Sequence, residues 1–277
     1  MLSEPSTDAR PRRAADTVSA AVVLGATANV IMQLARPAVG YGVVESRVDR
    51  GNLMLHPLHR LRTTSTYLSV TMLGDERDVR SYRRAVGRSH AQVHSTDDSP
   101  VAYDAFDREL QMWVAGCLVR AFEDTWALLA GRPGAWLPDE VYHECAALGT
   151  GLQVRPHQWP ADRAAFERWW DAQLEHVHLD DTVRGYLWGL VEQEFLPAPL
   201  RPLLAPSSRF LTAGFLREPF RSLMGFAWSD ADQERFERTM RRLGAVLNRT
   251  PGAVRRFPYN AFLADVRARR LLGMPLV

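Results

Sequence analysis

Histidines are the side chains of this chain best suited to bind a metal or to move protons near neutral pH, and the chain has 8 of them. Four of these form two close pairs. His90 and His94 are four residues apart in a stretch with helical apolar spacing, which predicts that both project from one helix face about one turn apart. His56 and His59 form the second pair, at the start of the preceding predicted helix. This spacing is typical of solvent-exposed or hydrogen-bonded pairs as well as of metal ligands, so both interpretations stay open.

Two acidic motifs could also bind metals. Glu140 and His143 have the Glu-x-x-His spacing of di-iron helix bundles, but such a site needs two of these motifs and two further glutamates, all facing inward. We therefore favour an exposed helix there. Asp180 and Asp181 are similar to the start of a magnesium-binding motif, but position 184 is an arginine, and the pair is better explained as a helix N-cap. Nucleophile-elbow and dinucleotide-binding glycine motifs do not occur in the sequence.

All 34 basic residues are arginine, which excludes Schiff-base chemistry and a phosphate-binding lysine. The net charge is only +2 and the acids are interspersed among the arginines, so no nucleic-acid partner is expected. Cys117 and Cys145 form no disulfide framework or metal motif, which favours a reduced, cytoplasmic setting. A chain of 277 residues with 46% apolar side chains is long enough for one large domain.

The N-terminal part admits three interpretations. Arg12 and Arg13 precede an apolar stretch at residues 18–35, an order similar to a twin-arginine export signal. Because that stretch also contains Asn29 and Gln33, we favour a buried core helix over an export signal or a stable membrane span.

Apolar spacing with a period of 3.6 residues dominates the chain beyond residues 1–14, which are polar, rich in proline and expected to form a mobile tail. Strand and hairpin signals are almost absent, so the sequence predicts a single all-α domain over residues 15–277. A proline-rich segment, 197–206, is expected to break the chain before the helix that starts at 209. The predicted helices cover residues 16–35, 56–73, 76–94, 107–131, 138–149, 161–177, 181–195, 209–226, 230–247 and 258–272.

Aromatic residues cluster at positions 169–170 and 215–228. Such clusters are more often ordinary core than a ligand site. They also fit a helical bundle that encloses a flat apolar cofactor.

The order of several segments from about residue 30 to 245 resembles the family of latex-clearing rubber oxygenases and of the membrane-bound oxygenase of mycophenolic acid biosynthesis. The segments that carry the resemblance are QLARPAVGYGVVES at 33–46, PLHRLRTT at 57–64, HAQV at 90–93, YDAFDREL at 103–110, WV at 113–114, Glu144, and the stretch from Leu211 to Trp228. Each segment alone is unspecific, and their shared order and spacing carries the assignment.

The resemblance implies an all-α bundle around one b-type haem with a histidine as the axial iron ligand. The interval to Tyr103 places that histidine at His90, with His94 as the alternative one turn away. Arg60 and Thr64 match the family's Arg-x-x-x-Thr segment and would have catalytic roles on the oxygen side of the haem.

The resemblance also assigns Arg60, Arg62 and Trp113 to the walls of the haem pocket, since an arginine fork matches a propionate. Three positions depart from the family. Thr63 stands where rubber oxygenases have a lysine ligand, Ala115 where the family usually has a histidine, and Glu45 where it has the histidine of a His-Ser pair.

The expected function is that of a haem-dependent oxidoreductase of secondary metabolism. It would act on an apolar small molecule, such as a polyketide or isoprenoid intermediate, with dioxygen or peroxide. A haem-dependent dehydrogenase or hydroxylase of the same fold, and a haem- or ligand-binding helical module without turnover, are the alternatives.

Overall fold

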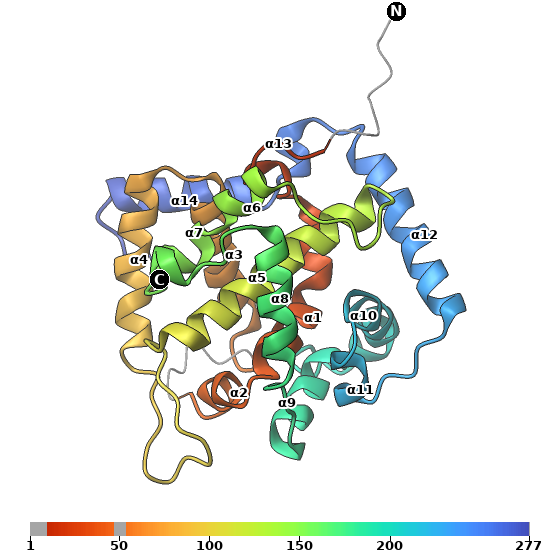
Figure 1. Ribbon diagram of the computed structural model, residues 1–277, viewed down its shortest axis with the longest axis horizontal. Coiled ribbons are helices and arrows are strands. Elements are labelled where there is room, and N and C mark those ends of the chain that lie inside the picture. The colour runs from red at the N-terminus through yellow and green to blue at the C-terminus, as the bar shows by residue number, and fades with distance from the viewer. Residues whose placement is uncertain (1–9, 47–53, 277) are drawn as a thin grey trace, which may run out of the picture.

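The computed structural model describes residues 10–46 and 54–276, and in this part of the chain the all-α prediction is confirmed (Figure 1). The one strand-like pairing within those residues is an isolated bridge between His94 and Asp104. The described helices are α1 (Ala26–Leu34), α2 (Pro37–Val44), α3 (Pro57–Leu73), α4 (Glu76–His90), α5 (Arg108–Leu129), α6 (Asp139–Cys145), α7 (Ala147–Thr150), α8 (Arg163–Leu174), α9 (Asp181–Val191), α10 (Arg201–Phe215), α11 (Phe220–Met224), α12 (Asp230–Leu247), α13 (Gly252–Arg255) and α14 (Tyr259–Leu271), with 3-10 turns η1 (Ala14–Asp16), η2 (Ala20–Gly25) and η4 (Pro156–Gln158).

Helix α5 runs through the middle of the molecule, and α1, α7 and α12 pack on it. Asp107 caps its N-terminus by accepting hydrogen bonds from the backbone N–H groups of Glu109 and Leu110, at 2.8 and 3.0 Å. At its other end α12 comes so close that Gly244 has room only for a hydrogen atom, because a Cβ there would overlap the carbonyl oxygen of Leu129. This close crossing fixes α12 against the central helix.

The apolar N-terminal stretch lies in the core, as predicted, but it is not one helix. It forms the 3-10 turn η2 up to Gly25 and only then α1, because glycine is a poor interior helix residue. A Cβ at position 25 would lie 3.3 Å from the ring of Phe215, a tight contact that glycine avoids. Its polar residues are satisfied internally: Asn29 donates to the carbonyl oxygen of Cys117 at 2.6 Å, and Gln33 donates to Asn29 at 2.6 Å.

The start of the chain also packs onto the body. Residues 1–9 of the predicted mobile tail lie outside the described part. Pro11 and Ala14 are buried, and the N–H of Ala14 donates to the carboxylate of Glu144 at 2.8 Å. Residues 11–14 are therefore held against α6.

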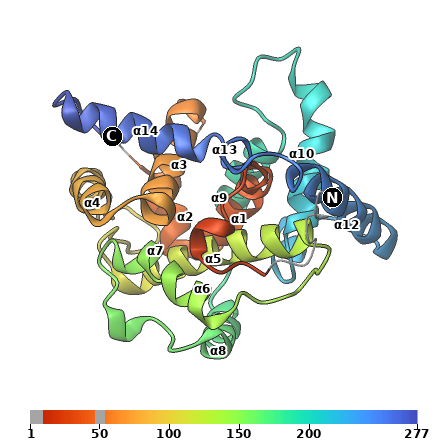
Figure 2. The same ribbon diagram turned by 90° about the horizontal axis from the view of Figure 1, so that it is seen from above.

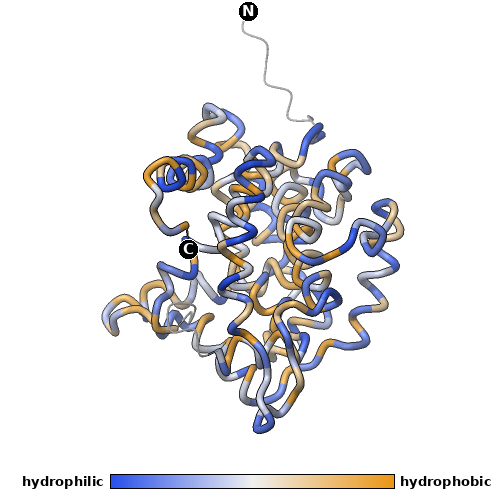
Figure 3. The backbone as a smooth tube through the Cα atoms, turned by 90° about the vertical axis from the view of Figure 1, so that its left-hand side faces the viewer, coloured by the Kyte–Doolittle hydropathy of each residue, from blue (hydrophilic) through white to orange (hydrophobic). Residues whose placement is uncertain are grey.

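Three helices form a unit beside the main core: α3, α4 and the C-terminal α14, which lies across α3 in the view from above (Figure 2). Pro57 occupies the first turn of α3, where a missing N–H costs nothing. Asp75 and Asp78 close a capping box at the start of α4. Along the helices apolar and polar residues alternate, as expected for elements with one buried face (Figure 3).

The predicted helices at 56–73, 107–131, 161–177, 181–195, 230–247 and 258–272 are confirmed to within a few residues at their ends. Two boundaries were wrong. The helix predicted over 76–94 ends at His90, because the following residues turn back and pair with the 103–105 segment. The helix predicted to start at 209 starts at Arg201, because Pro202 sits in the first turn, where no N–H partner is needed, and Pro206 is accommodated on an exposed face.

Other differences are smaller. The segment 138–149 contains two short helices, α6 and α7, and α10 is followed by the separate α11. Helix α2 was not predicted. Within the described residues, no single helix is long and apolar enough to cross a membrane; the pair Ala20–Leu34 and Pro37–Val44 meets the length and composition test only jointly, with a bend of 112° between its halves.

Candidate functional site

His90 is the last residue of α4 and is partly buried. Its Nδ1 atom is enclosed and has no hydrogen-bond partner within the described part of the chain. The ring of Phe106 meets it edge-on, with 6.4 Å between ring centroids. Burial and, to a smaller extent, the nearby positive charge of Arg60 together lower the pKa of His90 to about 4. The imidazole is therefore neutral at neutral pH and has a free nitrogen lone pair or N–H to offer.

Arg60 lies in the first turn of α3 and is partly buried. Burial lowers the pKa of its guanidinium, and the phenols of Tyr186 on α9 and Tyr82 on α4 act in the opposite direction. No carboxylate among the described residues contributes to this balance. A partly buried cation without a carboxylate is costly, so the surroundings of Arg60 favour an anion in addition to the groups that the structure describes.

The other two α3 residues of the predicted site face different surroundings. Thr64 is exposed one turn after Arg60, on the same side of the helix. Arg62 points instead to α14, where its Nη2 atom donates to Oδ2 of Asp265 at 2.6 Å. The structure thus brings His90 and Arg60 together and joins Arg62 to the C-terminal helix.

Trp113 lies in the centre of the molecule and is fully buried. Its indole N–H donates to the carbonyl oxygen of Gln33 at 3.0 Å, and its ring stacks on Trp170 with 5.0 Å between centroids. Phe220 packs on the same two rings. The aromatic residues around positions 169–170 and 215–228 are part of this core, and in the described contacts Trp113 is one of its packing residues.

His94 does not share a helix face with His90, and that prediction was wrong because α4 ends first. Its exposed ring lies four residues beyond the helix, with Nδ1 3.2 Å from the carbonyl oxygen of Ser95. It lines a separate pocket of about 280 Å³ whose walls do not include His90 or Arg60.

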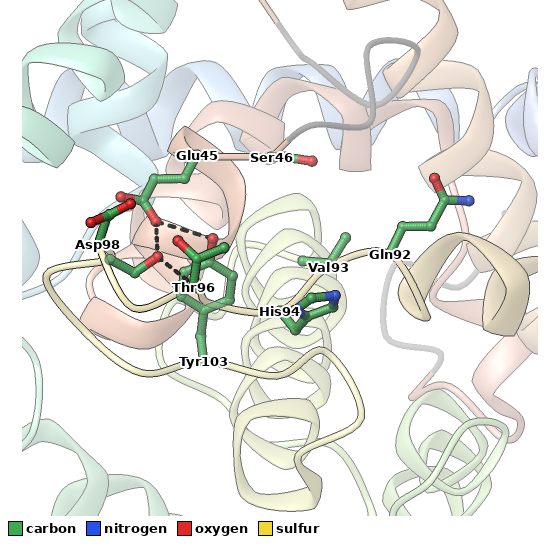
Figure 4. Close-up of a pocket in the computed structure, with 9 residues that line it drawn as sticks. Glu45, Ser46, Gln92, Val93, His94, Thr96, Asp98 and Tyr103 are labelled. Atoms are coloured by element: carbon green, nitrogen blue, oxygen red, sulfur yellow. Dashed lines mark hydrogen bonds between the residues drawn. The ribbon is translucent and has the colours of Figure 1, made fainter.

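That pocket is polar and is built from the end of α2 and the loop after α4 (Figure 4). Glu45 accepts hydrogen bonds from the hydroxyls of Ser99 at 2.8 Å and Tyr103 at 3.1 Å. In Figure 4, Glu45 and Asp98 lie at one end and His94 toward the other. No pattern in the sequence indicates this pocket, since its two walls come from segments about fifty residues apart and meet only in the folded chain.

The remaining candidates have structural partners. Asp180 caps α9 by accepting from the N–H of Val183 at 2.8 Å, as predicted, and it also accepts from the hydroxyl of Tyr41 at 2.5 Å. His143 is hydrogen-bonded to the carbonyl oxygen of Ala161 at 2.7 Å.

The Glu-x-x-His spacing occurs a second time, at 175–178, where His178 is exposed. Within the described residues, however, no three His, Cys, Asp or Glu side chains are grouped so as to hold a metal ion. In the other histidine pair, His56 is exposed and His59 is partly buried. A site in which His90 alone binds the metal of a cofactor has fewer than three such side chains, so this absence does not bear on it.

Residues that sequence reasoning missed are Phe106, Tyr82 and Tyr186, which contact His90 or act on the charge of Arg60. They come from a loop, α4 and α9. No spacing along the chain relates these positions, so only the fold could bring them together.

Comparisons with known proteins agree with the resemblance seen in the sequence. The family described as "ER-bound oxygenase mpaB/B'/Rubber oxygenase, catalytic domain" matches residues 12–245. The uncharacterized proteins Mb2261 of Mycobacterium bovis and Rv2237 of Mycobacterium tuberculosis are each 46% identical to this chain over 250 residues, which cover 90% of this chain and 98% of the relative. No solved structure matches significantly. The chain therefore belongs to the mpaB and rubber oxygenase catalytic-domain family, an oxygenase family.

Proposed function

We propose that this chain is a haem-dependent oxidoreductase that acts on an apolar small molecule, such as a polyketide or isoprenoid intermediate, with dioxygen or peroxide as the co-substrate. Its membership of an oxygenase family supports the reaction class. The arrangement around His90 supports the cofactor.

One observation carries the proposal: a neutral, enclosed imidazole with an unpartnered nitrogen lies near a partly buried cation that no described carboxylate neutralises. A histidine that holds haem iron must be unprotonated at the binding nitrogen, and His90 at the end of α4 would meet this requirement. The haem propionates are carboxylates, and one of them could pair with the guanidinium of Arg60, on which no described carboxylate acts. The residues present therefore fit a b-type haem.

In this proposal His90 holds the iron and Arg60 binds an anion at the same site. That anion is either a propionate or the negative charge that develops on the oxygen side, where the exposed hydroxyl of Thr64 could donate a hydrogen bond. When bound, the haem supplies a redox-active iron at which dioxygen or peroxide can be activated. The chain has no lysine, so a lysine could not serve as a second protein ligand to the iron of a bound haem.

The apolar character of the proposed substrate rests on exposed hydrocarbon next to these residues. Leu61 follows Arg60 on α3 and is 41% exposed, Leu55 precedes α3 and is 64% exposed, and Phe106 beside His90 is 37% exposed. Exposed apolar side chains on the segments that carry Arg60 and His90 support an apolar ligand.

The first test is a haem titration of the purified, haem-free protein, followed by absorption spectra of the oxidised, reduced and carbon-monoxide forms. We expect a Soret band, and we expect His90→Ala to raise the Kd for haem by more than about 10-fold. His94→Ala is the matched control and should leave the Kd unchanged. A wild-type protein without a Soret band, or loss of haem binding in the His94 variant alone, would overturn the assignment.

The second test separates the two roles of Arg60. If Arg60 acts on the oxygen side, Arg60→Ala and Thr64→Ala keep the haem occupancy of the wild type and lower turnover of an accepted substrate by about 10- to 1000-fold. If Arg60 binds a propionate, its variant loses haem and activity in parallel. A haem-loaded wild type that oxidises no apolar substrate with dioxygen or peroxide would instead be a haem-binding helical module.

The third test concerns the open coordination position. We expect azide, cyanide or imidazole to shift the spectrum of the oxidised haem-loaded protein. A resting spectrum that does not respond to these ligands would mean that a second side chain occupies the position.

A further inference from the structure

Helix α14 begins at Tyr259, beyond residue 245, where the match to the family's catalytic domain ends. It is nevertheless part of the same compact body. It lies across α3 and beside α4, the two helices that carry Arg60 and His90 (Figure 2).

The apolar contacts of α14 form a small core of their own, separate from the main core. Its buried members are Val70 of α3, Tyr82 of α4, and Leu263 and Val266 of α14. Half of the fully enclosed side chains in this cluster therefore belong to α14, and without them Val70 and Tyr82 would face water.

The polar contacts of the unit include one buried carboxylate, that of Asp78. Asp78, in the first turn of α4, is fully buried and accepts from Arg267 at 2.8 Å and from Arg270 at 2.6 Å, both on α14. The two guanidinium groups hold the pKa of the Asp78 carboxyl below its ordinary value, although burial by itself acts in the opposite direction. A carboxylate without exposed surface is stable as an anion only while such partners are in place.

Helix α14 also binds α3 through an ion pair, here a partly exposed one in which α14 supplies the carboxylate. Its Asp265 accepts from Arg62, which lies two residues after Arg60, at 2.6 Å. Between the two site helices, the hydroxyl of Tyr82 donates to the carbonyl oxygen of Thr63 at 2.9 Å. The three contacts connect α14, α3 and α4 into one unit whose far end carries His90.

We infer that α14 is the element that positions the His90 helix against the Arg60 helix, and that Asp78 and Arg270 are positioning residues for the site. Arg62 then serves to hold α3 to α14. The inference rests on the proposed function only for its haem readout. The part that does not depend on haem is that contacts with α14 order the C-terminal end of α4.

The test uses the full-length protein and two measurements on each variant: the Kd for haem by titration, and hydrogen exchange of the α4 amides that precede His90. The variants are Asp78→Asn, Arg270→Gln and Arg270→Lys, with Glu76→Gln as the matched control. Glu76 is in the same first turn of α4, but its carboxylate is exposed and pairs only with Arg80, at 2.9 Å, among the described residues. Circular dichroism first establishes that each variant keeps the helical content of the wild type.

We expect Asp78→Asn and Arg270→Gln to raise the Kd for haem by about 10-fold or more, within the range seen when residues that orient a ligand are lost. The Soret spectrum of the haem that still binds should change, and the α4 amides should exchange faster. Arg270→Lys keeps the positive charge and should stay within about threefold of the wild type, and Glu76→Gln should be unchanged.

Where Asp78→Asn does not fold, Arg270→Gln and Arg62→Gln carry the test, because both leave the buried carboxylate with at least one arginine. Unchanged haem affinity and unchanged exchange in the folded variants would refute the inference. An equal loss in Arg270→Lys and Glu76→Gln would refute it too, because it would show general fragility. If the wild type binds no haem while α4 exchanges faster in Arg270→Gln, the proposed function fails and the positioning role of α14 stands.

Discussion

The replacement of His90 by glutamine should make the haem-free protein less sensitive to acid. Below a pH of about 6.5 the histidine of the unfolded chain takes up a proton, whereas the buried histidine of the folded chain does so only near its pKa of about 4. Over that interval the unfolded state binds more protons than the folded state, so the free energy of unfolding falls as the pH falls. Below about pH 4 both states are protonated and the loss levels off.

The size of the effect follows from the two pKa values. A difference of about 2.5 units corresponds to about 3 kcal/mol when it is fully expressed, and to about 2 kcal/mol between about pH 7 and pH 5. For a protein of this length, about 2 kcal/mol lowers the melting temperature by about 4 °C. Burial is the larger cause of the lowered pKa of His90 and the charge of Arg60 the smaller one. Arg60→Gln should therefore recover only a minor part of the stability that is lost in acid.

The assay is thermal or urea unfolding of the haem-free protein at several pH values between about 7 and 5. The wild type loses stability over this range through several groups at once, and the difference between wild type and His90→Gln isolates the His90 contribution of about 2 kcal/mol. His94→Gln is the control, since His94 is exposed four residues further on. The free energy of unfolding, plotted against pH, should fall less steeply for His90→Gln than for the wild type. Parallel plots for these two proteins, or a shallower plot for His94→Gln, would show that His90 is not the neutral group described above.

Two further predictions concern the ion pairs and packing of the central helix α5. Glu123 is fully buried and binds the buried Arg163 and Arg120 at 2.5 and 3.2 Å. Glu123→Ala should cost about 3 kcal/mol in urea unfolding, because it leaves these two cations to share the single, partly exposed carboxylate of Glu167, at 2.7 Å from each. Glu234→Ala removes an exposed pair and should cost less than about 1 kcal/mol; similar losses for the two would contradict the buried network. Gly244→Ala should cost about 1–3 kcal/mol or more in the same assay, because the added methyl group meets the backbone of Leu129. Gly252→Ala, with no atom within 4 Å of the added methyl, should be nearly neutral, and a larger loss there than at Gly244 would refute the packing argument.

Local signals in the sequence determined most of the helices. The limits of α12 agree with its apolar spacing from residue 230 to 247, and Ser229 and Asp232 form the capping box that starts it. Gly74 and Asp75 mark the boundary between α3 and α4 because glycine ends one helix and aspartate caps the next. The order of segments likewise pointed to the family, which the comparison over residues 12–245 shows. Helix propensity, caps and segment order are properties of neighbouring residues, so the sequence expresses them directly.

The tertiary structure alone decided which of the candidate residues share a site. His90 and His94 have helical spacing, but the pairing of the 91–95 segment with residues 103–105 ends the helix between them. Arg60 and Arg62 are two residues apart on α3, and so point in different directions: one lies near His90, while the other binds Asp265 on a helix about two hundred residues away. The energies that fix these choices are those of buried charges and packed side chains, and they depend on partners that approach only when the chain has folded.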